Sequence, residues 1–421
     1  MAITRGARDA PADASAGGGG IGRIGSRELI VLISAIMALM ALGIDLLLPA
    51  FDDIRDEFGL SDESTQISQV ITAFFLGLST AQLVWGPLAD RFGRKPILLA
   101  GIGVYAFGAA ASAFAPSLAW LLGARFVWGV GAAAARVVAT AIIRDVFEGT
   151  DMAKAMSQVM AVFVMAPVFA PSIGAGLIIA FSWKAIFWSC VLFSAVIVAW
   201  SFRLPETLRP EHRRNLEFRS IASGFAEVAR NPITAGYTLA TVFMQGIFAA
   251  YLGSSERIVN EVFDRGPQFP VIFGATAILF GVGAIINGRV VGRFGTIRII
   301  HTMSWAVLAM TLVLLAVSMT AGGRPQFWVF MPLLGINLSM FMFLMPNLNT
   351  EALVPMGELA GTASSVTGAA RIFLGAFLGA AVDSQVTDST TPFVVAFVIF
   401  AVCLIASVRW AERHGVPVSS S

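Results

Sequence analysis

The chain has 421 residues, of which 57% are hydrophobic and only 13% charged, and its mean hydropathy is +0.80. Soluble globular domains carry about 25% charged residues, so this composition excludes an ordinary soluble domain and indicates a membrane protein. The formal net charge of +2 says little by itself and gives no reason to expect a nucleic-acid partner.

The first 28 residues contain Ala, Gly, Asp and Arg, including "AGGGG", without helical periodicity. We expect residues 1–28 to form a disordered cytoplasmic tail. Beyond this tail, apolar runs of 18 or more residues recur along the chain, and a helix of that length crosses a hydrocarbon layer of about 30 Å. β-Barrel spans would be shorter and alternating. The chain is therefore predicted to be an all-α integral membrane protein with twelve transmembrane helices.

The twelve predicted spans cover residues 29–51, 68–88, 97–115, 118–143, 155–180, 184–202, 233–254, 269–288, 297–320, 326–350, 360–382 and 391–410.

The longest internal polar stretch, "RLPETLRPEHRRNLEFRS", begins at Arg203 and divides these spans into two sets of six. We expect a six-helix bundle over 29–202, a cytoplasmic linker over 203–232, a second bundle over 233–410 and a cytoplasmic tail over 411–421. "GPLADRFG" at Gly86 is echoed by "GRVVGRFG" at Gly288, and each follows the second helix of its half. Such duplication predicts two pseudo-symmetric bundles, which many secondary transporters have.

Most of the 28 Lys and Arg residues fall in segments that are cytoplasmic when both termini are cytoplasmic. The positive-inside rule favours that orientation. Arg greatly outnumbers Lys, since Lys occurs only at Lys95, Lys154 and Lys184. This bias suggests a GC-rich bacterial genome, and we expect the bacterial cytoplasmic (inner) membrane as the location.

The turn between the second and third spans carries an unusual concentration of charge. Gly86 and Gly93 allow a tight reversal of the chain, and basic side chains there anchor the turn at headgroup depth. Asp90 needs another explanation, because anchoring does not require an acid. It would cap a neighbouring helix N-terminus or pair with the other half of the protein, which would make the turn a conformational latch.

Four charged residues lie well inside predicted spans, away from the first and last residues of each span: Asp45, Arg125, Arg136 and Arg371. A charge in mid-membrane costs on the order of 3 kcal/mol, so each is expected to face a cavity or a partner. Asp45 and Arg125 lie at similar depth below the outer surface and are expected to face each other. They would form either a permanent structural ion pair or a proton-coupling site in which Asp45 loads and releases a proton while Arg125 tunes it.

Arg136 follows Arg125 by three helical turns and projects from nearly the same face. Its alternatives are snorkelling to the cytoplasmic surface and attracting substrate into the cavity. Arg371 is close to the centre of its span, where it binds a polar or anionic substrate group, pairs with Asp45 across the cavity, or is a packed, water-solvated structural arginine. Gln245 and Asn347 are further cavity candidates, with helix–helix hydrogen bonding as the default. Three arginines against one carboxylate favour neutral, polar or acidic substrates over purely cationic ones.

"GPLADRFGRKPILL" resembles the signature loop of the major facilitator superfamily, through Gly86, Asp90, Arg91, Gly93, Arg94 and Lys95. With "GIDLLLPAF", "ARFVWGVGAAAARVVATAIIRDVF", "APSIGAG", "SWKAIF", "LPETL" and "GELAGTASSVTGA", the chain resembles the Bcr/CflA branch of twelve-span drug:proton antiporters over residues 29–410. The resemblance implies proton-coupled efflux of small molecules such as antibiotics, by alternating access in a monomer. It also implies a cavity lined by the spans of Asp45 and Arg125.

The same resemblance extends to two further groups of residues. Arg144 and Asp145 match the "RD" of the family and are expected beside the charged turn. The fifth span matches the antiporter helix through Pro167, Pro171 and Gly174, although Ala170 stands where the family has glycine. Gly292 stands where the second half would repeat Asp90, so an acidic latch is expected only once.

Other function classes have less support in the sequence. The residues form no nucleophile–base set and no phosphate-cradling loop, and His212, His301 and His414 form no cluster, so we expect no enzyme, metal site or cofactor. The alternatives that stay open are proton-coupled import of a small metabolite and a non-transporting membrane scaffold or sensor.

Overall fold

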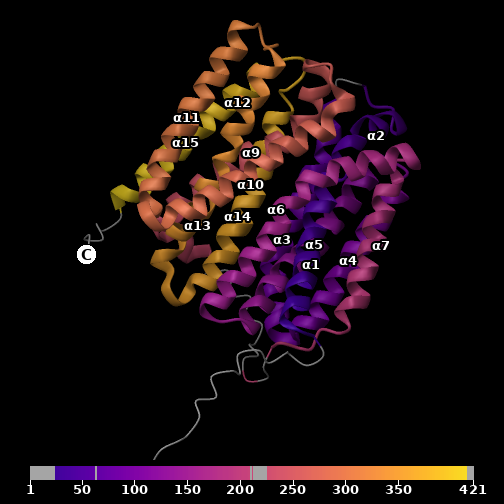
Figure 1. The fold of residues 1–421 in the computed structure, drawn as a ribbon, viewed down its shortest axis with the longest axis vertical. Helices are drawn as coiled ribbons and strands as arrows, with labels where there is room; N and C mark the ends of the chain where they lie inside the picture. The colour runs from indigo at the N-terminus through magenta and orange to yellow at the C-terminus, as the bar shows by residue number, and fades with distance from the viewer. Residues whose placement is uncertain (1–23, 62–63, 209–210, 212–224, 415–421) are drawn as a thin grey trace, which may run out of the picture.

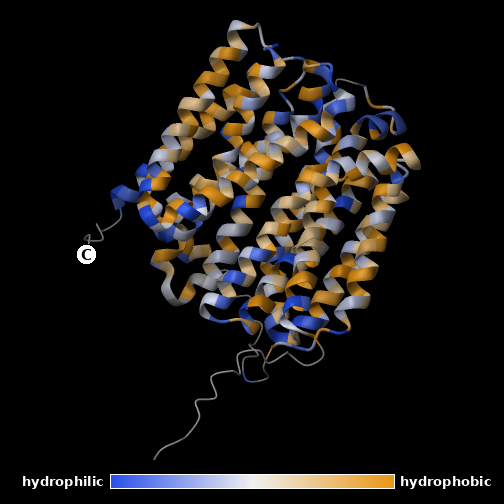
Figure 2. Cartoon of the chain, in the orientation of Figure 1, coloured by the Kyte–Doolittle hydropathy of each residue, from blue (hydrophilic) through white to orange (hydrophobic). Residues whose placement is uncertain are grey.

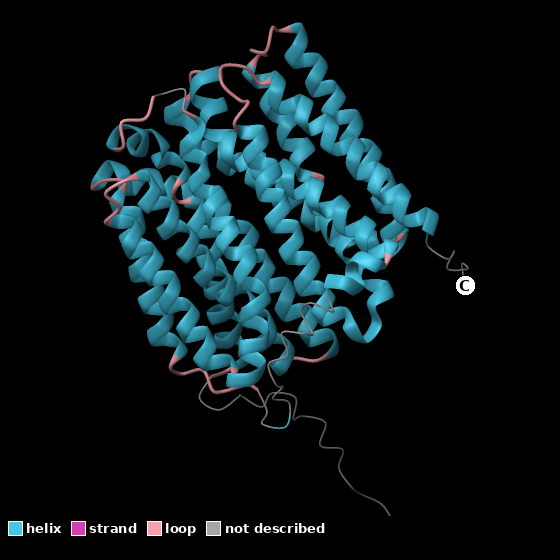
Figure 3. Cartoon of the chain, turned by 180° about the vertical axis from the view of Figure 1, so that it is seen from behind, coloured by secondary structure: helices cyan, strands magenta, loops and turns pink. Residues whose placement is uncertain are grey.

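The computed structural model describes residues 24–61, 64–208, 211 and 225–414, and these form helices joined by short turns (Figures 1 and 3). Within these ranges, twelve helices are long and apolar enough to cross a membrane, which confirms the predicted fold class. The tail residues 1–23 and 415–421 and the linker residues 209–210 and 212–224 lie outside the described residues.

The first half consists of α1 (Ser26–Asp45), η1 (Leu48–Ala50), α2 (Phe51–Glu57), η2 (Thr65–Ser68), α3 (Gln69–Phe92), α4 (Arg94–Ala113), α5 (Leu118–Val146), α6 (Gly149–Ala180) and α7 (Lys184–Ser201). The second half consists of α9 (Pro232–Arg257), the π-helix η4 (Ile258–Val262), η5 (Gly266–Gln268), α10 (Phe269–Phe294), α11 (Thr296–Thr320), α12 (Phe327–Ser339), α13 (Phe341–Leu353), η6 (Val354–Leu359), α14 (Ala360–Asp383) and α15 (Thr391–His414).

The two halves pack side by side as two helical bundles (Figure 1). Their main contacts join α3 to α14 and α6 to α10. In each pair, the second membrane helix of one half meets the fifth of the other, as a pseudo-two-fold arrangement requires. We call the end of the molecule where the linker leaves α7 the linker end, and the end that carries α2 and η4 the distal end (Figure 1).

The repeated turn has the same backbone conformation in both halves. Gly93, between α3 and α4, has a φ of +107°, and Gly295, between α10 and α11, has a φ of +77°. L-residues with a Cβ rarely adopt such angles, so glycine is required at both positions. The echo in the sequence therefore marks a true structural repeat.

Some predicted boundaries are wrong. Helix α1 begins at Ser26, inside the predicted tail, and α15 continues to His414, into the predicted C-terminal tail. The tenth span is two helices, α12 and α13, which meet at Met340. The first span continues through η1 and α2, so the helical run extends to Glu57 instead of residue 51.

Small residues allow close packing inside the first bundle. A Cβ at Gly77 of α3 would lie 2.9 Å from the carbonyl carbon of Phe126 on α5, and one at Gly129 of α5 would lie 2.9 Å from that of Phe74 on α3. Backbones this close maximise van der Waals contact, which drives helix association where water is absent.

The outer surface of the bundles is apolar (Figure 2). Large side chains such as Ile179, Leu192 and Trp328 are 87%, 68% and 69% exposed. A soluble protein rarely exposes so much apolar area, so these faces suit contact with lipid chains.

Candidate functional site

The distal end is closed by a set of polar residues, which we call the distal cluster: Asp52, Arg55, Ser64, Ser68, Ser254, Glu256, Arg257, Asn260 and Asp383. Most of them are buried, whereas Asp52 is exposed and Ser64 and Asn260 are half-buried. Two of its contacts connect α2 to the second half. Arg55 Nη2 pairs with Glu256 Oε2 at 3.2 Å, and Asn260 Nδ2 donates to Asp52 Oδ2 at 3.0 Å. Arg55 also pairs with Asp52 on its own helix.

Arg257 and Asp383 form the other part of the distal cluster. Arg257 Nη1 donates to the backbone oxygen of Val386 at 2.7 Å and lies 3.8 Å from Asp383 Oδ1, while its Nη2 donates to the backbone oxygen of Ser64 in the first half at 3.3 Å. Asp383 also accepts hydrogen bonds from Ser68 and, at 2.8 Å, from Ser254. The bundles are therefore joined here by several polar contacts, and two of them, Arg55–Glu256 and Ser68–Asp383, join side chains that are almost fully buried.

At the linker end, the two bundles are joined much more weakly. Gln82 Nε2 donates to the backbone oxygen of Ser365 at 3.2 Å, and Leu83 packs against a small apolar cluster that includes Met356 and Val366. Among the described residues, no ion pair connects the bundles at this end. The structure thus represents a conformation closed at the distal end.

Asp45 is the last residue of α1 and is only 4% exposed. Among the described residues, no hydrogen bond or ion pair includes its carboxyl group. Asp45 lies three residues before η1, which contacts α9 of the other bundle. Among the described residues, Asp45 is therefore a buried acid without a counter-ion, close to the place where the two bundles meet.

The expected pairing of Asp45 with Arg125 is not formed in this conformation. Arg125 is fully buried, its Nη1 donates to the backbone oxygen of Gly43 at 2.7 Å and its Nε donates to that of Val70 at 3.2 Å. Its guanidinium carbon lies 4.7 Å from the ring centres of both Phe74 and Trp128. A permanent Asp45–Arg125 ion pair is thus excluded, because the arginine binds backbone oxygens and aromatic rings instead, while its Nη2 has no hydrogen-bond partner among the described residues.

Arg125 nevertheless acts on the position of Asp45. Gly43, whose carbonyl group it binds, precedes Asp45 by two residues on the last turn of α1. Next to it, the Tyr105 hydroxyl donates to the backbone oxygen of Leu39 at 2.8 Å. The end of α1 is held from α4 and α5, so Arg125 is a positioning residue for the acid.

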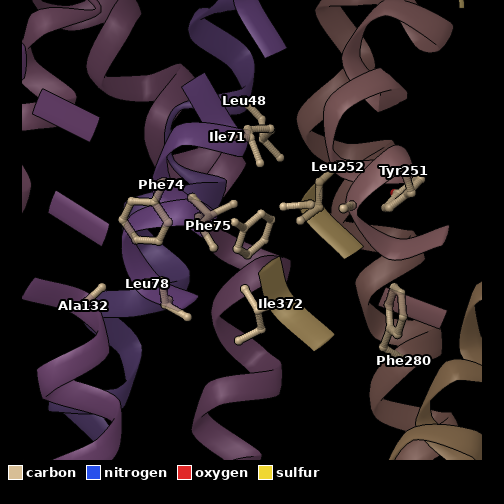
Figure 4. Close-up of a cluster of buried hydrophobic side chains, with 14 of the residues drawn as sticks. Leu48, Ile71, Phe74, Phe75, Leu78, Ala132, Tyr251, Leu252, Phe280 and Ile372 are labelled. Atoms are coloured by element: carbon tan, nitrogen blue, oxygen red, sulfur yellow. The ribbon is translucent and has the colours of Figure 1, made fainter. Parts of the chain in front are cut away.

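Arg136 lies on α5 and Arg371 on α14, so the two arginines come from different bundles. Both are half-buried, and Arg371 Nε is a buried donor without a partner. The seam between the bundles is otherwise apolar at its middle, where Phe75 of α3 lies beside Leu252 of α9 and Ile372 of α14 (Figure 4).

The two uncharged candidates lie within the second bundle. Asn347 on α13 donates to Asn287 Oδ1 on α10 at 3.0 Å and to the backbone oxygen of Phe343 at 2.7 Å, so its amide links helices, which was the default interpretation. Gln245 on α9 is 6% exposed and packs against Gly375 of α14. These interactions give no evidence that Asn347 or Gln245 touches a substrate.

The charged turn is held by partners within its own bundle. Arg94 pairs with Asp90 at 2.5 Å and with Asp145 of α5 at 2.8 Å. The expectation that Asp90 caps a helix or pairs with the other half is wrong for this conformation, since its partner is Arg94. Asp145 lies beside the turn as expected, whereas Arg144 is exposed.

Glu206 in the "LPETL" segment is a partner of this turn that the sequence did not identify. Its carboxylate accepts hydrogen bonds from the backbone N–H groups of Arg94 at 2.8 Å and Lys95 at 3.2 Å, which are the first residues of α4. Lys95 Nζ in turn donates to the backbone oxygen of Phe202 at 2.9 Å. An acid at a helix N-terminus satisfies free donors and the helix dipole, so the start of the linker is fastened to the first bundle.

The antiporter helix α6 contacts both halves at its small and proline residues. A Cβ at Gly174 would lie 3.1 Å from the carbonyl carbon of Leu46, next to Asp45. Pro167 and Pro171 lie inside α6, and between them Val168 presents its backbone oxygen to Gly274 of α10. The expected close helix contact at Gly174 is confirmed, and α6 is the helix that touches both the Asp45 region and the other bundle.

Comparisons with known proteins agree with this architecture. A family model described as Major Facilitator Superfamily matches residues 32–380. The chain is 30% identical over 386 residues to a bicyclomycin resistance protein homolog of Haemophilus influenzae, covering 90% of this chain and 94% of the relative. It is 25% identical over 356 residues to the multidrug resistance protein MdtL of Escherichia coli, covering 82% and 85% of the two chains.

Solved structures resemble the fold at low sequence identity. The xylose transporter XylE from E. coli, in a partially occluded inward-open conformation, has a TM-score of 0.71 at 11% identity and covers 93% of this chain and 98% of its own. The human organic anion transporter MFSD10 has a TM-score of 0.63 at 18% identity and covers 91% and 99%.

Two pseudo-symmetric bundles of membrane helices, together with the matching family model and the resistance-protein relative, define a membrane transporter. The match of the family model over most of the chain is specific enough to name the group. The chain belongs to the Major Facilitator Superfamily, as the charged turn predicted.

Proposed function

We propose that this protein exports small molecules, such as antibiotics, across the bacterial inner membrane in exchange for protons. The names of the relatives, a bicyclomycin resistance protein homolog and a multidrug resistance protein, support efflux over import. We propose that the linker end, which carries Arg91, Arg94 and Lys95, faces the cytoplasm together with both termini. The protein would work as a monomer, and its substrates would be neutral, polar or acidic.

The observation that carries this proposal is the environment of Asp45. A carboxyl group that is buried at the seam of two bundles, without an ion pair, is stable there in its neutral form. When the distal end opens, water reaches the seam and the charged form becomes favourable. Asp45 would therefore bind and release a proton as the two ends open in turn, with α1 held in place by Arg125 and Gly174.

Substrate and proton are linked in this scheme through the same seam. Asp45 lies three residues before η1, which contacts α9 of the other bundle, so the charge state of Asp45 would change how the two bundles meet. A transporter that moves only when Asp45 is protonated or when substrate is bound exchanges one for the other. The distal cluster would hold the closed conformation, and the turn around Asp90 and Arg94 would act at the cytoplasmic end.

Inverted membrane vesicles test the proposal. Respiration acidifies the vesicle lumen, and a pH-sensitive dye reports the loss of the gradient when a transported antibiotic exchanges for protons. We expect at least one compound of an antibiotic panel to discharge the gradient with the parent protein and with Asp56→Asn, an exposed acid on α2, but not with Asp45→Asn. Retained discharge in Asp45→Asn, at equal amounts of inserted protein, would exclude Asp45 as the proton site.

A further inference from the structure

One face of α10 changes from apolar to basic as the helix approaches the linker end. Ile278, Val282 and Ile285 follow one another at steps of four and three residues, and all three are exposed on the surface that suits lipid chains. Arg289 and Arg293 follow at two further steps of four, so they lie on the same face of the helix, and both are exposed. The lipid-facing surface of α10 therefore ends in two neighbouring cations.

The turn after α10 adds apolar groups to these cations. The guanidinium carbon of Arg293 lies 5.5 Å from the centre of the Phe294 ring, and that ring is exposed. On the first turn of α11, Ile297 and Arg298 are exposed as well. An arginine that stacks on an exposed ring presents a charged end to the headgroup layer and an apolar body to the acyl chains.

The turn at the same position in the first half differs, because acids balance its bases. Three bases and three acids lie in this turn or contact it: Arg91, Arg94, Lys95, Asp90, Asp145 and Glu206. Here too an arginine stacks on an exposed ring, since the guanidinium carbon of Arg91 lies 5.3 Å from the centre of the Phe92 ring. The first turn is therefore held by carboxylates of its own bundle.

The second turn has a different set of partners. Gly292 occupies the position of Asp90, and Thr296 occupies the position of Arg94. The Thr296 hydroxyl donates a hydrogen bond to Glu351, so this acid is engaged by a neutral group. In the part of the chain that the structure describes, no ion pair includes any of the exposed arginines of this turn, which are Arg289, Arg293 and Arg298. Their positive charge is open to a ligand.

We propose that Arg289, Arg293 and Arg298 bind the phosphate group of an anionic phospholipid. Arginine binds phosphate oxygens through paired N–H donors, and an anionic headgroup supplies the negative charge that this turn lacks. Phe294 and Ile297 contact the acyl chains of the same lipid, so the surface fits a lipid better than a soluble phosphate. The second turn is thus tied to the membrane, and this inference does not depend on transport of any substrate.

The first test is native mass spectrometry of the delipidated full-length protein in detergent, titrated with phosphatidylglycerol or with zwitterionic phosphatidylcholine. The first phosphatidylglycerol is expected to bind about tenfold or more tightly than phosphatidylcholine, because each arginine near an anionic headgroup contributes a factor of about five. Equal affinities for the two lipids would overturn the proposal.

Three variants assign the binding to residues. Arg289→Gln and Arg293→Gln are each expected to weaken phosphatidylglycerol binding about fivefold and to leave phosphatidylcholine binding unchanged. Arg91→Gln is the matched control, because Arg91 stacks on an exposed ring in the same way but lies beside Asp90, and it should bind phosphatidylglycerol as the parent does. Parent affinity in the double variant Arg289→Gln/Arg293→Gln would contradict the site.

Two further arms establish where the lipid binds and which ligand the site accepts. A photoreactive phosphatidylglycerol in nanodiscs should form adducts within residues 289–298, and adducts confined to residues 91–95 would contradict the placement. Excess inorganic phosphate should not displace phosphatidylglycerol, because it has no acyl chains to contact the exposed ring. Displacement by inorganic phosphate would show that the arginines accept any phosphate and would overturn the lipid assignment.

Discussion

Replacing Arg55 by leucine removes the cation that faces Glu256 in the distal cluster. The two side chains are 2% and 4% exposed as residues and meet at 3.2 Å, so the pair is almost completely shielded from water in the closed conformation. Removing one partner of a buried pair destabilises by about 3 kcal/mol or more, because the remaining charge stays buried. In the open conformation, water solvates Glu256 and the penalty disappears. The substitution should therefore shift the equilibrium towards distal opening on the order of 100-fold.

Cysteine labelling measures that shift. Ile71 is 3% exposed and lines a small cavity with Ser68 and Asp383 of the distal cluster, so Ile71→Cys is accessible from outside only when the distal end opens. The background carries Cys190→Ala and Cys403→Ala, which removes both native thiols. A charged maleimide that does not cross the membrane should label intact cells carrying Arg55→Leu at least tenfold faster than cells with the parent protein.

The double variant Arg55→Leu/Glu256→Leu is the matched control. Two apolar side chains replace the ion pair with little change in free energy, whereas Asp52 stays solvated because its side chain is 57% exposed. Labelling should return towards the parent rate. Equal labelling of the parent and Arg55→Leu, or equally fast labelling of the single and double variants, would refute the assignment of this pair to distal closure.

Three further outcomes follow from the packing. Gly93→Ala should lower the unfolding temperature, since the substitution strains a φ of +107° and brings a Cβ to 3.0 Å from the carboxyl carbon of Glu206. Gly292→Ala is the control and should leave the unfolding temperature unchanged, because Gly292 has open space around it and no positive φ. Arg125→Lys should lower the free energy of unfolding by about 2 kcal/mol or more, because lysine cannot make both backbone hydrogen bonds and also stack on two rings. An unchanged free energy of unfolding in chemical denaturation would contradict the role of Arg125 in positioning α1. Gly174→Val should reduce transport while Gly176→Val, at a position with open space, should not, as measured by drug efflux from cells.

Much of the fold can be predicted from the sequence. Each membrane helix must form its backbone hydrogen bonds internally and expose apolar side chains to lipid, so it is visible in the sequence as an apolar run. The turn at Gly93 and its repeat at Gly295 were also predictable, since positive φ and close approach leave glycine as the only fitting residue. Asp45 could be predicted as a functional residue because placing an acid inside a membrane span is energetically unfavourable and therefore indicates a function.

The distal cluster could not be predicted in the same way. Glu256, Arg257 and Asp383 follow directly after apolar runs, where charged residues are ordinary loop residues. Only the tertiary arrangement brings the ends of α9 and α14 against α2 and buries them together. Hydropathy placed Arg55 outside the membrane for the same reason, although the helical run continues past it to Glu57.

The partners predicted for the charged residues were wrong for a related reason. Asp45 and Arg125 lie at similar depth, but the sequence contains no information about the carbonyl groups and rings that compete for the guanidinium. Because α1, α3 and α5 pack around Arg125, its guanidinium contacts the carbonyl group of Gly43 and the rings of Phe74 and Trp128 instead of Asp45. Asp90 similarly pairs with Arg94, one helical turn away, in the conformation seen here.

Transport by reconstituted protein tests the central claim, that Asp45 couples protons to substrate, most directly. In proteoliposomes, Asp45→Asn is expected to retain exchange of labelled for unlabelled substrate, because the cavity and both gates are intact, and to lose accumulation driven by a pH gradient. Accumulation against a gradient at the parent level in Asp45→Asn would contradict the account, since the proton would then travel through another group.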